Sequence, residues 1–396
     1  MVEKTTSPVI PPRLFSPSNA TSLEAFKTLV TTSTCPDYPL ATEITQNIPI
    51  YTLPPYSTLT PASASALQDE WSHILLSGPG IFITRSLFPS RALLTTVNSV
   101  YDSILAAERS SRTANGGDHF APSGANSRLW NSLSKHCLAD PVSFLEYYSN
   151  PYLALISSAW LGPAHRITAQ LNTVHPGGAP QTPHRDYHLG FQSAESCALF
   201  PRHQHTASQF LTLQGAVAHS DMPAASGPTR LLPFSQRFEG GYLAYRRPEF
   251  AEFFDKSWVS VPLGMGDGMF FNPALFHAAG ANTSAHVHRS ANLLQISSAF
   301  GKPMENIDTE VLIERCWEGL VGMYTEDGEV SARVRAAVGC LGEGYAFPTN
   351  LDRRVPESAG MAPESEQELL VRALKGNLGK EEVMRGLRRM KGDSLA

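Results

Sequence analysis

Residues 266–295 read GDGMFFNPALFHAAGANTSAHVHRSANLLQ and combine strand-like runs with distinctive polar residues. One apolar run opens after the turn Gly266-Asp267-Gly268 and ends at His277, and a second run begins at Arg289. Short apolar runs separated by Gly- and Pro-containing turns are typical of strands in a barrel or sandwich. The stretch therefore predicts two strands, each with a chemically distinctive residue at one end.

The same pattern of short apolar runs and turns begins further upstream, at Ile167. Six β-like runs, divided by Gly and Pro turns, cover 167–174, 209–219, 229–234, 258–263, 268–279 and 289–300. Helical patterns flank them: one helix ends at Gly78-Pro79-Gly80, Ser90 can cap another, 140–162 is helical, and helical patterns return after Phe300. The expected fold is mainly β with flanking helices, an α+β arrangement.

The chain divides into three parts by composition. Residues 1–62 are rich in Pro, Ser and Thr and predict an extended arm, which either lies along the folded body or forms a disordered tail. Residues 63–300 form the expected main domain, and 301–396 a helical extension packed on it or extending from it. Within the main domain, 110–136 is too rich in Gly and Ser for regular structure, and we expect a loop that could serve as a lid.

Composition narrows the classes of partner. Of the 396 residues, 42% are hydrophobic and 17% charged, which fits a globular protein with a substantial core. The net charge of −5 and the scattered Lys and Arg predict no binding to nucleic acid or membrane. Five widely spaced cysteines predict a reducing compartment, so we expect a cytoplasmic protein. The expected partner is a small molecule, and a homodimer is possible.

A metal site is indicated by QTPHRDYHLGF at 181–191. In a strand, residues two apart project to the same side, so His184 and Asp186 can reach a common point while Arg185 faces away. His277 supplies a third candidate ligand from its distant run. Two histidines and one carboxylate leave three positions of an octahedral ion free, as in non-haem Fe(II) oxygenases.

Those three positions suit a 2-oxo acid and dioxygen. The acid can chelate through its carboxylate and keto oxygen, and its far carboxylate then needs a cation in a dry pocket. Arg289 fits that role. Oxidative decarboxylation of this co-substrate would give succinate and CO2 and the power to remove hydrogen from an unactivated carbon.

A family resemblance rests on three segments taken together. Q-x-x-H-R-D from Gln181 to Asp186, GPTRLLPFSQRF at 227–238 and the stretch 266–289 resemble the phytanoyl-CoA dioxygenase family of Fe(II)/2-oxoglutarate oxygenases, over about 68–300. The resemblance implies a double-stranded β-helix, that is, a jelly-roll or cupin-like core. It also implies that His184, Asp186 and His277 bind iron, that Arg289 binds 2-oxoglutarate, and that Gln181 lies beside the co-substrate.

The substrate is predicted less closely. The favoured reaction is hydroxylation, desaturation or oxidative cyclisation of an amino acid or a secondary-metabolite intermediate. The candidate substrate contacts are His188, Arg128, Trp130 and Tyr187. An acyl-CoA substrate is disfavoured because no basic cluster suits the nucleotide phosphates. A non-catalytic jelly-roll that binds a metal or ligand, an iron oxidase that uses no 2-oxoglutarate, and a zinc hydrolase stay as alternatives.

Overall fold

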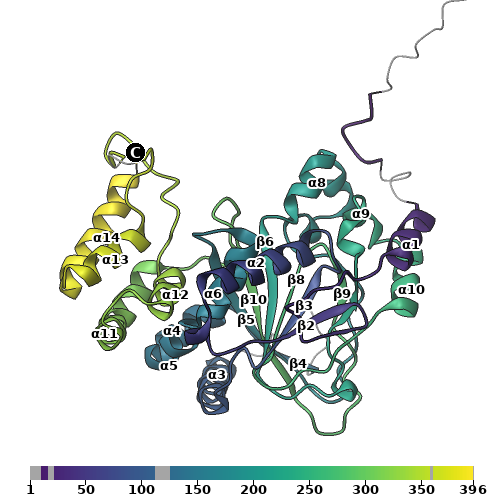
Figure 1. Ribbon diagram of the computed structural model, residues 1–396, viewed down its shortest axis with the longest axis horizontal. Coiled ribbons are helices and arrows are strands. Elements are labelled where there is room, and N and C mark those ends of the chain that lie inside the picture. The colour runs from purple at the N-terminus through teal and green to yellow at the C-terminus, as the bar shows by residue number, and fades with distance from the viewer. Residues whose placement is uncertain (1–9, 17–21, 112–124, 357–359, 396) are drawn as a thin grey trace, which may run out of the picture.

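The computed structural model describes residues 10–16, 22–111, 125–356 and 360–395 (Figure 1). Within these ranges the strands form two sheets. The strands are β1 (Glu43–Thr45), β2 (Ile48–Thr52), β3 (Ile81–Arg85), β4 (Asn126–Leu129), β5 (Arg166–Val174), β6 (Thr212–Ala218), β7 (Arg230–Leu232), β8 (Gly268–Phe271), β9 (Phe276–Ala278) and β10 (Arg289–Ser297).

The large sheet has the order β1-β2-β3-β8-β6-β10-β5-β4. Its neighbouring strands are antiparallel except for β2 and β3. The small sheet pairs β7 with β9 and is widened by isolated bridges from His184 to His277 and from Leu231 to Val259. The two sheets face each other as a double-stranded β-helix with flanking helices, so the expected α+β jelly-roll core is confirmed.

Most of the longer helices lie on the outer face of the large sheet. The longer helices are α1 (Leu23–Thr32), α2 (Pro61–Leu76), α3 (Arg91–Ser111), α4 (Ser132–Ala139), α5 (Pro141–Tyr148), α6 (Pro151–Leu161), α10 (Pro248–Ser257), α11 (Thr309–Asp327), α12 (Ala332–Leu341), α13 (Glu366–Lys375) and α14 (Lys380–Ser394). Of these, α1 and α10 instead pack against the small sheet. None of the helices in the described ranges combines the length and the apolar character needed to cross a membrane.

Successive side chains of each strand point alternately to this helical layer and to the inner face of the large sheet. Outward residues such as Phe82, Leu171 and Leu294 join one core cluster with the helices, and Trp71 of α2 stacks on Phe82 with ring centroids 5.5 Å apart. Inward residues such as Ala216 and Leu293 face the small sheet. The helices therefore support the sheet from behind and leave its inner face for a pocket.

The C-terminal helices pack onto the helical layer. Helix α11 contacts α4 and α5, and α12 contacts α5, α6 and β5, which places α11 to α14 at one end of the molecule (Figure 1). Helix α13 buries Leu369, Leu370 and Leu374 in the main core cluster. The division at residue 300 stays a prediction, although this packing suits an extension that rests on the core.

The N-terminal segment contributes to the large sheet. In the segment 1–62, which we expected to form an arm, β1 and β2 pair with each other, and Ile50 of β2 lies opposite Ile83 of β3. Ile48 and Ile50 are fully buried. The sheet therefore begins at residue 43, twenty residues before the expected domain boundary at 63; residues 1–9 and 17–21 of the arm lie outside the described ranges.

The run 268–279, expected to be one strand, forms two strands in different sheets. Asn272 and Pro273 separate β8 from β9, and the Asn272 side chain accepts a hydrogen bond from the backbone of Ala274 at 2.9 Å, which closes a turn. Proline cannot donate to a ladder, so the chain leaves the large sheet here and crosses to the small one. The expected strand at 258–263 is reduced to single bridges at Val259 and Leu263.

The polar stretch 110–136 contains more regular structure than expected. Strand β4 and the start of helix α4 lie within it, and β4 closes one edge of the large sheet against β5. Pairing with a neighbouring strand outweighs the weak local preference of Asn126, Ser127 and Arg128 for a strand. Residues 112–124, the rest of the expected lid, lie outside the described ranges.

The turn before β8 depends on one carboxylate. Asp267, with 7% of its side chain exposed, accepts from Gly264 N at 2.8 Å, Ser86 N at 2.9 Å and the Arg85 guanidinium at 2.7 Å. Gly266 has φ +97°, and a β-carbon there would lie 2.3 Å from the carbonyl oxygen of Phe88. The sequence Gly-Asp-Gly is therefore required by the close approach of the loop after β3.

We expect Asp267→Ala to lower the free energy of unfolding by about 2–3 kcal/mol, because it leaves two backbone amides and a guanidinium without their acceptor. Urea denaturation measures this change. The exposed Arg389, which pairs with Asp393 four residues along α14, provides the control, and Arg389→Ala should change stability by about 0.5 kcal/mol or less. Equal effects of the two substitutions would contradict the role of Asp267.

Candidate active site

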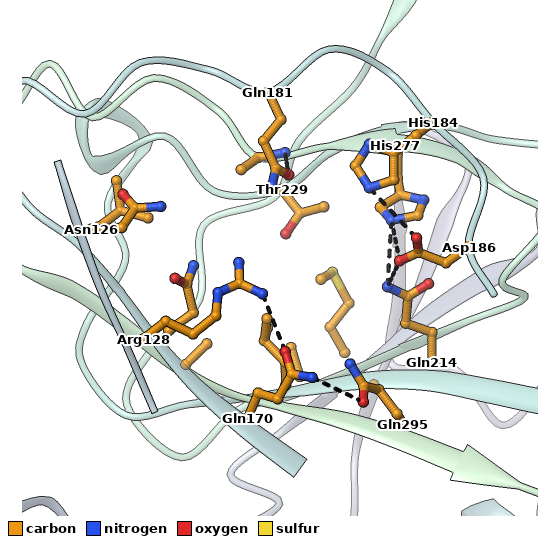
Figure 2. Close-up of a pocket in the computed structure, with 18 of the residues that line it drawn as sticks. Asn126, Arg128, Gln170, Gln181, His184, Asp186, Gln214, Thr229, His277 and Gln295 are labelled. Atoms are coloured by element: carbon orange, nitrogen blue, oxygen red, sulfur yellow. Dashed lines mark hydrogen bonds and ion pairs between the residues drawn. The ribbon is translucent and has the colours of Figure 1, made fainter. Parts of the chain in front are cut away.

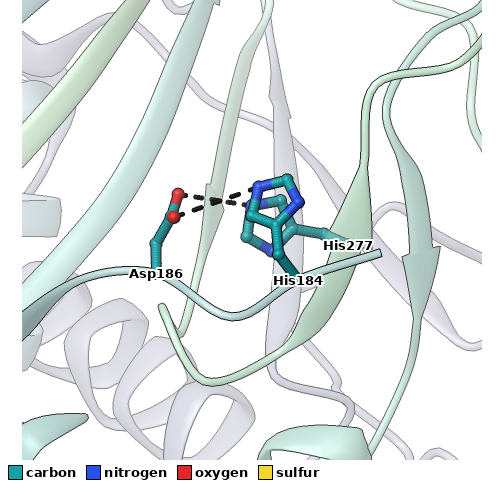
Figure 3. Close-up of side chains that lie close together, drawn as sticks. All are labelled: His184, Asp186 and His277. Atoms are coloured by element: carbon teal, nitrogen blue, oxygen red, sulfur yellow. Dashed lines mark ion pairs between the residues drawn. The ribbon is translucent and has the colours of Figure 1, made fainter. Parts of the chain in front are cut away.

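Three side chains from two distant segments meet at one point between the sheets (Figure 3). One possible ligand atom from each of His184, Asp186 and His277 lies within 4.8 Å of the others. The Nε2 atom of His184 is 3.9 Å from one oxygen of Asp186, and the Nε2 atom of His277 is 3.5 Å from the other. The predicted triad is thus brought together in space.

Backbone hydrogen bonds hold these three residues next to one another. His184 N donates to the His277 carbonyl at 3.0 Å, and His277 N donates back to the His184 carbonyl at 3.1 Å. Asp186 N donates to the Pro273 carbonyl at 3.0 Å. His184 makes a single bridge and no continuous strand, so the alternation that predicted the shared side of His184 and Asp186 is supplied by pairing with β9.

Hydrogen bonds to both imidazoles set their tautomers. His184 Nδ1 lies 2.9 Å from the Thr182 carbonyl, and His277 Nδ1 lies 2.9 Å from the Leu275 carbonyl. A carbonyl only accepts, so each Nδ1 carries a proton, and the neutral form of each ring has its lone pair on Nε2. Both lone pairs are on the nitrogens that face Asp186, as a metal ligand requires.

The charge state of the cluster also suits a cation. Burial tends to raise the pKa of Asp186, but His184 and His277 outweigh it and hold this pKa at about 2. Burial, together with the proximity of His277, lowers the pKa of His184. One carboxylate and two imidazole nitrogens are the donor set that a divalent transition metal prefers, so these residues fit the iron that the sequence implied.

A cavity of about 580 Å³ opens beside the triad, between the two sheets (Figure 2). Amide side chains at inward positions of the large sheet line one wall: Asn126, Gln170, Asn172, Gln214 and Gln295. Gln170 Nε2 lies 3.4 Å from Gln295 Oε1, and Gln214 Nε2 donates to Asp186 at 2.7 Å. Sequence reasoning missed these amides, although their spacing of two along β5 was visible.

Arg289 is buried at the start of β10 and lines this cavity, with 7% of its surface exposed. Its Nη1 donates to the carbonyls of Ser226 and Gly280, each at 3.2 Å. These carbonyls converge because Gly227 and Gly280 pack together; a β-carbon on Gly280 would lie 2.7 Å from the Gly227 oxygen. No carboxylate of the described residues forms an ion pair with Arg289, and burial lowers its pKa to about 10.

Gln181 and Tyr187 also line the cavity. The Oε1 atom of Gln181 accepts from Ala279 N at 3.1 Å, which leaves its Nε2 to donate elsewhere (Figure 2). Tyr187 is buried, and burial followed by the charge of Asp186 raises the pKa of its hydroxyl well above the usual value. It therefore faces the cavity as a neutral hydroxyl.

Arg128 and Trp130 lie across the cavity from the triad (Figure 2 shows Arg128). The guanidinium of Arg128 lies over the Trp130 ring at 5.1 Å from its centroid and donates to Gln170 Oε1 at 3.1 Å. Met304, which follows the core strands, completes this side. The cavity is thus lined by the triad at one end and by β4 and β5 at the other.

His188, a predicted substrate contact, lies in a turn just after Asp186. Its φ is +45°, it begins a short 3-10 helix, and its Nε2 lies 3.2 Å from the hydroxyl of Thr212. It is not among the residues that line the cavity. The turn at His188 ends the extended backbone, so the alternation that puts His184 and Asp186 on one side does not extend to it.

Arg185 faces away from the triad, as expected. Its Nη2 donates to the carbonyls of Ser235 and Phe238 at 2.6 and 2.9 Å. The guanidinium also lies against Gly241, where a β-carbon would be 1.9 Å from its central carbon. Arg185 thereby joins the loop that carries His184 and Asp186 to the segment after β7.

We compared the sequence with models of known protein families. The model of the phytanoyl-CoA dioxygenase family matches residues 96–291, from α3 to the third residue of β10. The chain belongs to this family. It is therefore a non-haem iron enzyme that uses 2-oxoglutarate and dioxygen, and the resemblance read from the sequence is confirmed.

Solved structures give more distant similarities. The 2-oxoglutarate-dependent epimerase SnoN from nogalamycin biosynthesis is 17% identical, with 61% of this chain and 85% of that chain covered and a TM-score of 0.40. The carbocyclase SnoK of the same pathway is 18% identical, with 62% and 95% covered and a TM-score of 0.42. AviO1 from Streptomyces viridochromogenes Tue57 is 15% identical, with 62% and 98% covered and a TM-score of 0.41. No curated protein matches the sequence.

We expect His277→Ala or Asp186→Ala to weaken Co(II) binding more than about 100-fold, beyond the roughly 10–100-fold loss typical of outer partners of a metal site. Anaerobic titration followed by the visible absorption of Co(II) measures the affinity. His188→Asn is the matched control, since Asn tolerates positive φ, and it should bind Co(II) like the wild type. Loss of binding in this control as well would contradict the assignment of the ligands.

Proposed function

We propose that this enzyme oxidises an unactivated C–H bond of a small molecule at the centre formed by His184, Asp186 and His277. The observation that carries the proposal is the pair of imidazoles whose Nε2 atoms face one carboxylate beside a cavity, with each Nδ1 held by a backbone carbonyl. These three residues would hold Fe(II) by two nitrogens and one carboxylate oxygen. When bound, iron with 2-oxoglutarate and dioxygen supplies the oxidising power, and the co-substrate leaves as succinate and CO2.

Arg289 is proposed to bind the far carboxylate of 2-oxoglutarate. Its Nη1 is held by the Ser226 and Gly280 carbonyls, and its remaining donors serve an anion in a site largely closed to water. A buried guanidinium without an acidic partner among the described residues is costly unless an anion binds there. Gln181, on the small-sheet side of the same cavity, would donate from its Nε2 to the co-substrate.

The remaining cavity is proposed to bind the substrate. Trp130 and Tyr187 provide aromatic surface, Arg128 and the amides of β4 and β5 provide hydrogen-bonding groups, and Met304 provides an apolar contact. This lining suits an amino acid or a secondary-metabolite intermediate, which would be hydroxylated, desaturated or cyclised. His188 is no longer proposed as a contact.

An acyl-CoA substrate fits less well. Among the described residues that line the cavity, the basic ones are Arg128, Arg185 and Arg289, and Arg185 is directed at backbone carbonyls behind the triad. Three nucleotide-linked phosphates require a denser cluster of cations. The cavity instead has room for 2-oxoglutarate and one small molecule.

We expect Arg289→Met to raise the Kd for 2-oxoglutarate about 30-fold, which corresponds to the loss of about 2 kcal/mol from a buried charge-assisted contact. The weak visible charge-transfer band of the anaerobic Fe(II) protein reports binding, and succinate formation reports turnover. Arg289→Lys should bind with intermediate affinity, because it keeps the charge but loses the paired donors.

Arg128→Met is the matched control for this measurement. Arg128 lines the same cavity from β4, two strands away from β10, and its substitution should change the Kd for 2-oxoglutarate by no more than about threefold. If Arg289→Met bound 2-oxoglutarate with wild-type affinity, the co-substrate would have to lie elsewhere. If the wild type formed no succinate with any substrate tried and bound no 2-oxoglutarate, a non-catalytic ligand-binding role would replace the proposed one.

A further inference from the structure

Gln214 occupies a central position in the large sheet, next to the triad but outside it. It lies on β6, between Phe271 of β8 and Gln295 of β10 in the register of the sheet, and faces the cavity. Figure 2 shows its side chain directed at Asp186 and His277. A side chain on a central strand, with hydrogen-bonded neighbours on both sides, is held in place more firmly than one on a loop.

The contact with Asp186 fixes which end of the Gln214 amide is the nitrogen. Its Nε2 donates to Oδ2 of Asp186 at 2.7 Å and lies 3.4 Å from Nε2 of His277. An ionised carboxylate only accepts, so the amide cannot turn its oxygen toward Asp186 without placing two acceptors in contact. The orientation of the Gln214 amide follows from this contact alone.

The other end of the amide has no such partner. Oε1 of Gln214 is buried and accepts no hydrogen bond from the described residues. Buried polar atoms are nearly always paired, so an unpaired oxygen needs an explanation. The contact with Asp186 accounts for it, because it holds the amide by its nitrogen and so fixes where the oxygen lies.

We infer that Gln214 is a positioning residue that holds Asp186 so that one of its oxygens binds the metal. The inference rests on the proposed function of the triad. The bond to Oδ2 restrains rotation of the carboxylate and leaves Oδ1, which is 3.9 Å from Nε2 of His184, free for the metal. A carboxylate that bound through both oxygens would take one of the three positions that 2-oxoglutarate and dioxygen require.

The neighbouring amide Gln295 supplies a matched comparison. It lies directly opposite Gln214 on β10, it is also glutamine, and it also lines the cavity. Its side chain, however, interacts with Gln170 and with the hydroxyl of Tyr187, and not with the triad. The two positions therefore differ in their contact with Asp186, and a substitution at each separates positioning from packing.

The test measures Co(II) binding to Gln214→Leu and Gln295→Leu in the whole chain, under anaerobic conditions, with and without 2-oxoglutarate. Gln214→Leu is expected to weaken Co(II) binding about 10–100-fold, the range typical of lost outer partners, and to alter the visible Co(II) spectrum. Gln295→Leu is expected to keep wild-type affinity within about twofold and an unchanged spectrum. The melting temperature of each variant in excess chelator reports folding separately.

Gln214→Met is the second variant, because Met matches the length of Gln without a donor and tolerates core positions. It is expected to reproduce the loss of affinity even if the branched Leu disturbs folding. Wild-type affinity and spectrum in a folded Gln214→Met protein would overturn the positioning role while leaving the triad intact. Failure of the wild type to bind Co(II) at all would instead overturn the metal centre, and with it this inference.

Discussion

The pair of backbone hydrogen bonds between His184 and His277 is the constraint on which the active site depends. It joins a loop after β5 to a strand nearly one hundred residues later, and it is the bridge that adds the loop to the small sheet. Through it, two imidazoles reach one point with their Nε2 atoms together. The bonds from Gln181 N to the Ala279 carbonyl and from Asp186 N to the Pro273 carbonyl extend the same pairing, so the loop 181–191 is held beside β9 and Asp186 lies opposite the two rings.

A turn, a buried arginine and the helices behind the large sheet hold this bridge in place relative to that sheet. Asn272 and Pro273 take the chain from β8 in the large sheet to β9 in the small one, so the segment that carries His277 crosses the cavity. Arg185 anchors the loop from behind through the carbonyls of Ser235 and Phe238. On the opposite wall, the helices packed behind the large sheet keep β6 and β10 in register, which positions Gln214 and Arg289.

Much of the site could be predicted from sequence because its chemistry is carried by a few residue types at recognisable positions. His184, Asp186 and His277 come together as expected, and Arg289 begins a strand at the cavity. The amide wall was missed because the one local signal, the spacing of two between Gln170 and Asn172, does not reveal the amides of the other strands. Only the register of β4, β5, β6 and β10 aligns Asn126, Gln170, Gln214 and Gln295 on one face.

The sequence by itself determined the class of fold and the residue types that can bind iron, because periodicity of two, turn residues and donor chemistry are local properties; the family came from the resemblance of three segments to known members. Tertiary structure decided which sheet each strand joins, why β1 and β2 belong to the core, and where His188 points. These depend on pairing between distant segments, which no local pattern specifies. The burial of Arg289 and the contact of Gln214 with Asp186 arise only when two sheets face each other across a cavity.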